Sequence, residues 1–204
     1  MSFLGAMTLA GGLLLLIDGK PTPRTDGLSL SPLAAATTVN SISSDPLTQT
    51  RVPLNHPKWQ AIVIHHSGST RGDPTSIEKE NAAGTTGGGL GHHFIIGNGN
   101  GMDDGQLYIG YRWLDQLSGT HASGRYARFY NDSAISICLV GDGDRHGFTQ
   151  AQIQQLTMLV ESLCKQLNLG PDRVLLHSDI AEVSDPGRLF PTGLQGLPSG
   201  RGRR

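Results

Sequence analysis

The sequence has no excess of charge of either sign. Its 204 residues include 16 Lys and Arg against 17 Asp and Glu, a formal net charge of −1, and only 16% of the residues are charged. A protein that binds nucleic acid through its phosphates needs a basic surplus, so we expect no nucleic-acid partner. The hydrophobic content of 37% is too high for a disordered chain. The length fits one domain with an extension.

Cysteine is also scarce. Two cysteines cannot build a disulfide framework for a chain of this length. Cys138 falls in an apolar run, and Cys164 falls on the apolar side of an expected helix. We expect two thiols that pack as small hydrophobic groups and form no disulfide. Cysteine usage therefore does not indicate the cellular compartment.

No hydrophobic run is long enough to span a bilayer. The apolar N-terminal stretch 3–17 has 15 residues, fewer than the roughly 20 that a spanning helix needs. It fits the core of a signal peptide, although no Lys or Arg precedes it and no clear cleavage site follows. We interpret residues 1–17 as a signal-like segment or membrane anchor, and a short buried or interfacial helix is the alternative. Export to the periplasm, cell envelope or medium follows from the first interpretation.

Two further segments lack the periodicity of folded elements. Residues 18–56 are rich in Ser, Thr and Pro and are expected to form a linker, so deletion of residues 1–50 should leave a folded domain. Residues 193–204 form a Gly- and Arg-rich tail that we expect to be flexible. The domain itself is expected to span residues 57–192.

Within that domain, short apolar runs alternate with helical patterns. The runs predict strands at 61–64, 93–96, 106–110, 134–140 and 173–176. A short helix is expected at 73–80, and Thr149 and Gln152 form a capping box that begins a long amphipathic helix, which ends before Gly170 and Pro171. The pattern predicts an α/β fold with a mixed central sheet flanked by helices.

Three potential metal ligands follow these elements. His65 and His177 stand directly after apolar strands, and Asp185 lies eight residues beyond His177. Two imidazoles and a carboxylate form a common catalytic zinc site, with water in the fourth position. The same set binds non-haem Fe(II). Histidines at strand ends can also be ordinary hydrogen-bonded residues, so spacing alone leaves these alternatives open.

A series of segments resembles a known family, and this resemblance decides between the metal and non-metal interpretations. These segments, in order over about residues 57–191, are 62–67, 91–97, 119–122, 131–142, the helix after Thr149, 174–179 and 185–188. Together they resemble the zinc-dependent N-acetylmuramoyl-L-alanine amidases, whose fold is shared by phage-lysozyme-type amidases and peptidoglycan recognition proteins. The resemblance implies this fold, a Zn²⁺ cofactor held by His65, His177 and Asp185, and a peptidoglycan or muropeptide substrate.

The sequence departs from that family at several positions. Asp185 stands where the phage-type branch has Cys, and His92 stands where that branch has a Tyr close to the zinc. Val183 replaces a Lys or Thr, and Cys138 does not match a Glu of the muropeptide-cleaving branch. The acid–base work would then fall to His92 or, failing that, to Glu182. Because side chains alternate along a strand, only one of His92 and His93 can face the metal, and the register of the motif selects His92.

Other matched residues suggest supporting roles. His121 corresponds to a family residue that lines the substrate groove, although a structural role in its loop is the alternative. Asn131, the second substrate-site candidate, is expected to fix the loop backbone by side-chain hydrogen bonds. His66 is expected to pack behind the metal. The leading hypothesis is a monomeric zinc amidase acting on the bond between N-acetylmuramic acid and L-alanine. The alternative is a peptidoglycan-binding module of the same fold that has lost catalysis.

Overall fold

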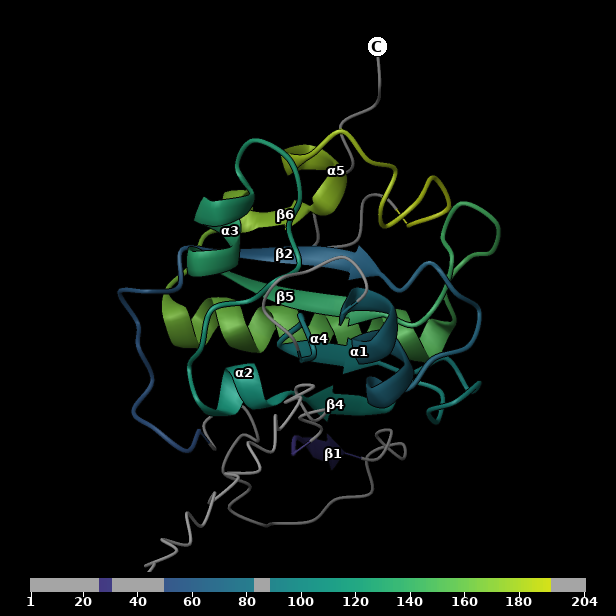
Figure 1. Cartoon of the computed structure of the whole chain (residues 1–204), viewed down its shortest axis with the longest axis horizontal. Helices are drawn as coiled ribbons and strands as arrows, with labels where there is room; N and C mark the ends of the chain where they lie inside the picture. Colours follow the sequence, from purple (N-terminus) through teal and green to yellow (C-terminus); the bar gives the residue numbers. More distant parts are fainter. Residues whose placement is uncertain (1–25, 31–49, 83–88, 192–204) are drawn as a thin grey trace, which may run out of the picture.

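A mixed β-sheet forms the centre of the protein (Figure 1). The computed structural model describes residues 26–30, 50–82 and 89–191, and within them six strands follow the order β1-β4-β3-β5-β2-β6. Strands β3, β5, β2 and β6 are parallel, whereas β4 and β1 are antiparallel to their neighbours. The bounds are Leu28–Leu30 (β1), Ala61–His66 (β2), Phe94–Ile96 (β3), Leu107–Ile109 (β4), Ala134–Leu139 (β5) and Val174–Leu176 (β6).

Helices connect and cover these strands. Their bounds are Pro74–Ala82 (α1), Tyr111–Leu114 (α2), Ala127–Ser133 (α3), Gln150–Leu167 (α4) and His177–Ile180 (α5), with a 3₁₀ turn at Pro171–Arg173. The predicted α/β fold with a mixed sheet is therefore confirmed. The expected strands and the two expected helices are present with shifts of a few residues at their ends. The three short helices α2, α3 and α5 were not predicted, because four to seven residues are too few to show a 3.6-residue period.

The long helix α4 is joined to the sheet through its first turn. The predicted capping box is present: the Thr149 hydroxyl accepts from the Gln152 amide at 3.0 Å, and the Gln152 carboxamide oxygen accepts from the Thr149 amide at 3.2 Å. The same Gln152 side chain donates to the carbonyls of Ile96 and Val140, at the ends of β3 and β5. One residue thus starts the helix and fixes its position on the sheet.

The two faces of the sheet have different compositions. Ile62 and Ile64 of β2 and Ile135 and Ile137 of β5 pack with the apolar side of α4 in the largest core cluster. Burial of each such side chain contributes about 1.5–3 kcal/mol. The alternate residues of the same strands face the opposite side, and His65 is one of them. The sheet therefore has one apolar face and one face that carries polar groups.

Both cysteines are free thiols, as expected, with Cys138 buried and Cys164 half-buried. The expected N-terminal segment 1–17 and tail 193–204 lie outside the described residues. Among the helices that the structure describes, none is long and apolar enough to cross a membrane.

A short edge strand lies within the segment expected to be a linker. Strand β1 pairs antiparallel with β4, and the amide of Gly27 donates to the Tyr108 hydroxyl at 3.0 Å. The three residues of β1 are too few to show an alternating pattern in a segment that is otherwise rich in Ser and Pro. Part of the 18–56 segment therefore extends the sheet.

Deletion of residues 1–50 should consequently have a measurable cost. We expect the shortened chain to fold, but to melt about 5 °C lower, because it loses a few hydrogen bonds of about 1 kcal/mol each. Thermal unfolding monitored by circular dichroism measures this difference. A chain that begins at residue 26 keeps β1 and is the control. Equal melting temperatures for the two shortened chains would contradict a stabilising role for β1.

Candidate metal centre

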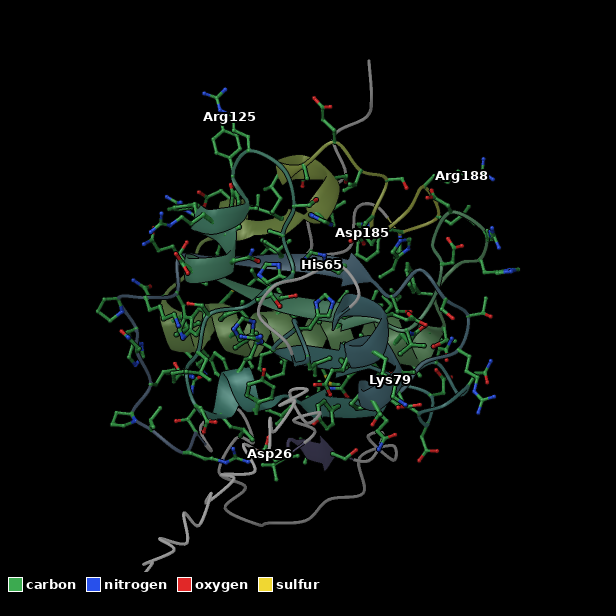
Figure 2. The ribbon with its side chains drawn as sticks, viewed as in Figure 1. Asp26, His65, Lys79, Arg125, Asp185 and Arg188 are labelled. Atoms are coloured by element: carbon green, nitrogen blue, oxygen red, sulfur yellow. The ribbon has the colours of Figure 1, made fainter. Side chains whose placement is uncertain are left out.

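The site is built where β2 ends. Strand β2 lies between the parallel strands β5 and β6. His65 is its fifth residue, and only 1% of this residue is exposed. His177 follows β6 directly and begins α5. Because β2 and β6 are adjacent and parallel, their carboxyl ends bring the two imidazoles together, with ring centroids 4.5 Å apart. His65 and Asp185 both point into this region in Figure 2.

One carboxylate oxygen of Asp185 is held by a backbone amide, and the other faces both imidazoles. Its Oδ1 accepts from the backbone amide of His66 at 2.6 Å. Its Oδ2 lies 2.9 Å from Nδ1 of His65 and 2.8 Å from Nδ1 of His177. The turn that carries Asp185 is anchored through Gly187 and Gly143, whose backbones approach so closely that a Cβ on either would collide with the other segment.

These three side chains have the geometry of a metal site. One donor atom of each lies within 4.8 Å of the other two. Tetrahedral zinc with ligands at about 2.0–2.1 Å would separate neighbouring donor atoms by about 3.4 Å, a value between the 2.8–2.9 Å from Asp185 Oδ2 to each imidazole and the 4.8 Å within which all three atoms lie. Each imidazole Nδ1 can either donate a hydrogen to the carboxylate or give a lone pair to a cation that takes the place of that hydrogen. The donor set therefore fits zinc.

The protonation states also suit metal binding. Burial lowers the pKa of His65, so this imidazole is neutral near pH 7 and has a lone pair to donate. Burial alone would raise the pKa of Asp185, but the neighbouring His65 and the hydrogen bonds from both imidazoles hold it well below its ordinary value. Asp185 is therefore ionised. His66 is not part of the set, since its Nδ1 accepts from the Gly143 amide at 3.0 Å, behind the cluster as expected.

The His92–His93 pair divides between two environments. The ring centroid of His92 lies 5.2 Å from that of His65, and its Nδ1 lies 2.6 Å from the hydroxyl of Ser136. His93 instead contacts Trp59 edge-on at 4.9 Å and lies 3.0 Å from the Leu117 carbonyl. Burial lowers the pKa of His93 to about 3. His92 is thus the member of the pair beside the candidate metal centre.

Of the two predicted substrate-site residues, His121 lies in the loop before α3 and Asn131 lies within α3. The Asn131 side-chain oxygen accepts from the amides of His121 and Ala122, at 2.8 Å each, which is the loop-fixing contact expected of it. His121 is buried against the metal centre, with its Nδ1 3.0 Å from Nε2 of His65. Contact of either residue with a substrate stays a prediction.

Glu182 lies apart from the imidazoles. It is exposed and lines a hollow of about 490 Å³ between the loop before α3 and the end of α5, together with Arg125, Tyr126 and Asp179. Arg125 points outward from this corner in Figure 2. Among the contacts of the described residues, none joins Glu182 to His65 or His177. Val183, two residues before Asp185, has only an apolar side chain.

Sequence reasoning missed two polar residues of the site. Ser136 interrupts the apolar run of β5 and contacts His92, and Ser123 lies 3.3 Å from Nε2 of His177 through its hydroxyl. A buried serine in the middle of an apolar strand is a signal that the sequence contained. The position of Ser123 depends on the course of a loop and left no comparable pattern.

Comparison with known proteins agrees with this geometry. The family model described as N-acetylmuramoyl-L-alanine amidase matches residues 55–188. The chain belongs to the N-acetylmuramoyl-L-alanine amidase family. Among curated relatives, an endolysin of Enterobacteria phage T3 is 32% identical over 41% of this chain and 62% of its own length, and that of Escherichia phage T7 is 31% identical over the same shares. The chain thus spans about 62% of the length of the curated relatives that it matches.

Solved structures show the same amidase-family fold. The N-acetylmuramoyl-L-alanine amidase LysC from Clostridium intestinale is 26% identical, with a TM-score of 0.55 over 70% of this chain and 86% of that one. The Drosophila peptidoglycan recognition protein PGRP-LB also has a TM-score of 0.55, over 71% of this chain and 86% of that one, at 20% identity. At 20% identity, the similarity to PGRP-LB shows a shared fold alone.

Removal of a ligand should strongly weaken metal binding. We expect the purified chain to bind one zinc ion, and His177→Ala and Asp185→Ala each to lower zinc affinity by more than the roughly 10–100-fold that an outer hydrogen-bond partner contributes. Competition with a chromophoric chelator measures the affinity. Glu182→Gln, which removes an exposed acid three residues from Asp185, is the matched control. Wild-type affinity in Asp185→Ala would refute this ligand assignment.

Proposed function

We propose that the chain is a zinc-dependent hydrolase that cleaves the amide between N-acetylmuramic acid and L-alanine in peptidoglycan or its soluble fragments. The observation that carries this proposal is the convergence of His65, His177 and Asp185 in a chain of the amidase family. When bound, zinc would polarise the substrate carbonyl and lower the pKa of a water molecule. The substrate lies outside the cytoplasm, so the proposal includes export of the chain.

His92 is the residue proposed to act on the reacting atoms. Burial, with the nearby His65 as a second cause, lowers the pKa of His92 well below its ordinary value, so its ring carries one hydrogen at neutral pH. The position of that hydrogen depends on Ser136. Among the described residues, the buried Ser136 hydroxyl makes its one hydrogen bond with Nδ1 of His92.

Complete hydrogen bonding favours one tautomer of His92. If Nδ1 carried the hydrogen, the Ser136 hydroxyl would accept it and leave its own hydrogen buried without an acceptor, which costs about 1–3 kcal/mol. If the hydroxyl donates to Nδ1, no hydrogen is stranded and the ring hydrogen resides on Nε2. His92 would then offer an N–H donor that can stabilise the oxyanion of the reacting amide. A proton acceptor role, the alternative for His92, would need the opposite tautomer.

A second candidate function is supported by the lack of a proton donor in the described part of the site. Val183 supplies no proton donor beside Asp185, and no other acid among the described residues contacts the imidazoles. This absence favours a peptidoglycan-binding module that holds zinc without turnover. Product analysis separates the two functions, because only the hydrolase releases peptides with a free N-terminal alanine from purified peptidoglycan.

Replacement of His92 should slow hydrolysis without removing zinc. We expect His92→Ala to lower kcat by about 10²-fold or more, the usual loss for one oxyanion donor. His92→Tyr should retain part of the activity because its hydroxyl also donates. Steady-state kinetics on a soluble muropeptide, with zinc content measured in parallel, checks this. Glu182→Gln is the control with near wild-type kcat. If Glu182→Gln is inactive and His92→Ala is active, the two assignments are reversed.

Ser136 should matter through the orientation of His92. We expect Ser136→Ala to lower kcat by about tenfold, within the range of a hydrogen bond to a positioned group, with KM unchanged. Cys138→Ala is a matched control, because it removes the next buried side chain on the same face of β5. ¹⁵N NMR of the His92 ring should show the hydrogen on Nε2 in the wild type. A hydrogen on Nδ1 would favour the proton-acceptor role instead.

A further inference from the structure

His65 uses both of its ring nitrogens. Nδ1 faces Asp185 Oδ2 at 2.9 Å, and Nε2 faces Nδ1 of His121 at 3.0 Å. The rings of His65 and His121 meet edge to face with centroids 4.9 Å apart. Two ring nitrogens at this distance attract only if one hydrogen lies between them, because two lone pairs repel. Each ring therefore determines the tautomer of the other.

A metal on His65 selects one of the two arrangements. An imidazole that donates its Nδ1 lone pair to a cation carries its hydrogen on Nε2, from which it must donate to His121. Nδ1 of His121 then accepts, and its own hydrogen lies on its Nε2. That atom is buried without a hydrogen-bond partner among the described residues.

The second imidazole of the centre is supported differently. Nε2 of His177 contacts only Ser123 in the described part of the chain, with the hydroxyl at 3.3 Å and the amide at 3.4 Å. Ser123 is exposed, so water can replace its hydroxyl. No water can replace His121, because that ring is enclosed and 9% exposed. On the Nε2 side, His65 is therefore oriented by a buried neighbour, whereas His177 is oriented by one that water can replace.

We propose that His121 is a positioning residue: when Nδ1 of His65 binds the metal, Nδ1 of His121 accepts the hydrogen on Nε2 of His65 and so fixes the orientation of that ligand. This role rests on the proposed zinc centre. It differs from the substrate contact expected for His121, because both nitrogens of this ring face the interior. Outer hydrogen-bond partners of this kind typically change metal affinity by about 10–100-fold.

Two substitutions of similar shape isolate the hydrogen bond. Asn places Oδ1 the same number of bonds from Cβ as Nδ1 of His and can accept from His65, whereas Leu has the same branching and cannot accept. In the full chain, zinc affinity from chelator competition should remain within a few fold of wild type in His121→Asn and fall by about 10–100-fold in His121→Leu. Ser123→Ala, which removes the corresponding contact to His177, should leave zinc affinity near wild type.

The outcomes distinguish this role from a structural one and from failure of the metal centre. Equal affinities for His121→Asn and His121→Leu, both folded by circular dichroism, would overturn the proposal. If His121→Leu does not fold, ¹⁵N NMR of the zinc-loaded wild type decides: an unprotonated Nδ1 of His121 supports the proposal, and a protonated one overturns it. A wild type that binds no zinc would remove the metal centre itself, and this inference with it.

Discussion

The hydrogen bond from the His66 amide to Asp185 is the constraint on which the candidate site depends. It joins the last residue of β2 to a loop that lies 119 residues further along the chain. Because one carboxylate oxygen is fixed by this bond, the other must face the imidazoles of His65 and His177. Because β2 lies between β5 and β6 in the sheet, its backbone is among the more rigid parts of the fold, and the position of the carboxylate is set by the sheet rather than by its loop.

The composition of the sheet explains how a polar cluster can be buried without weakening the core. Parallel strands deliver residues alternately to two faces, so β2 and β5 pack isoleucines against α4 and present His65 and Ser136 on the other side. The apolar face supplies the stability that lets the opposite face hold groups chosen for chemistry. Buried imidazoles cost little here, because burial keeps them neutral and most of their nitrogens have partners.

Much of this arrangement could be predicted from the sequence, and the remainder has identifiable causes. Strand ends are visible as apolar runs that stop at a histidine, so His65 and His177 could be singled out, and the family resemblance implied that they share one metal with Asp185. The alternation rule also separated His92 from His93. The contact between His65 and His121 could not be foreseen, because it depends on the path of a loop with no period of its own. Strand β1 escaped prediction for a related reason: three residues pair with β4 by backbone hydrogen bonds, which do not require a side-chain pattern.

The distribution of hydrogens among the histidines gives the site its chemical character. His93 accepts from the Ser136 amide through Nδ1, so its hydrogen lies on Nε2 and is directed to the Leu117 carbonyl. The same Ser136 reaches His92 through its hydroxyl, so one residue of β5 orders both members of the pair. With Val183 unable to donate, the hydrogens that could serve an amide substrate are those of imidazoles whose tautomers the protein has already fixed. In the proposed hydrolase, such a site would stabilise developing negative charge with donors that need no rearrangement, rather than rely on proton transfer by a mobile acid.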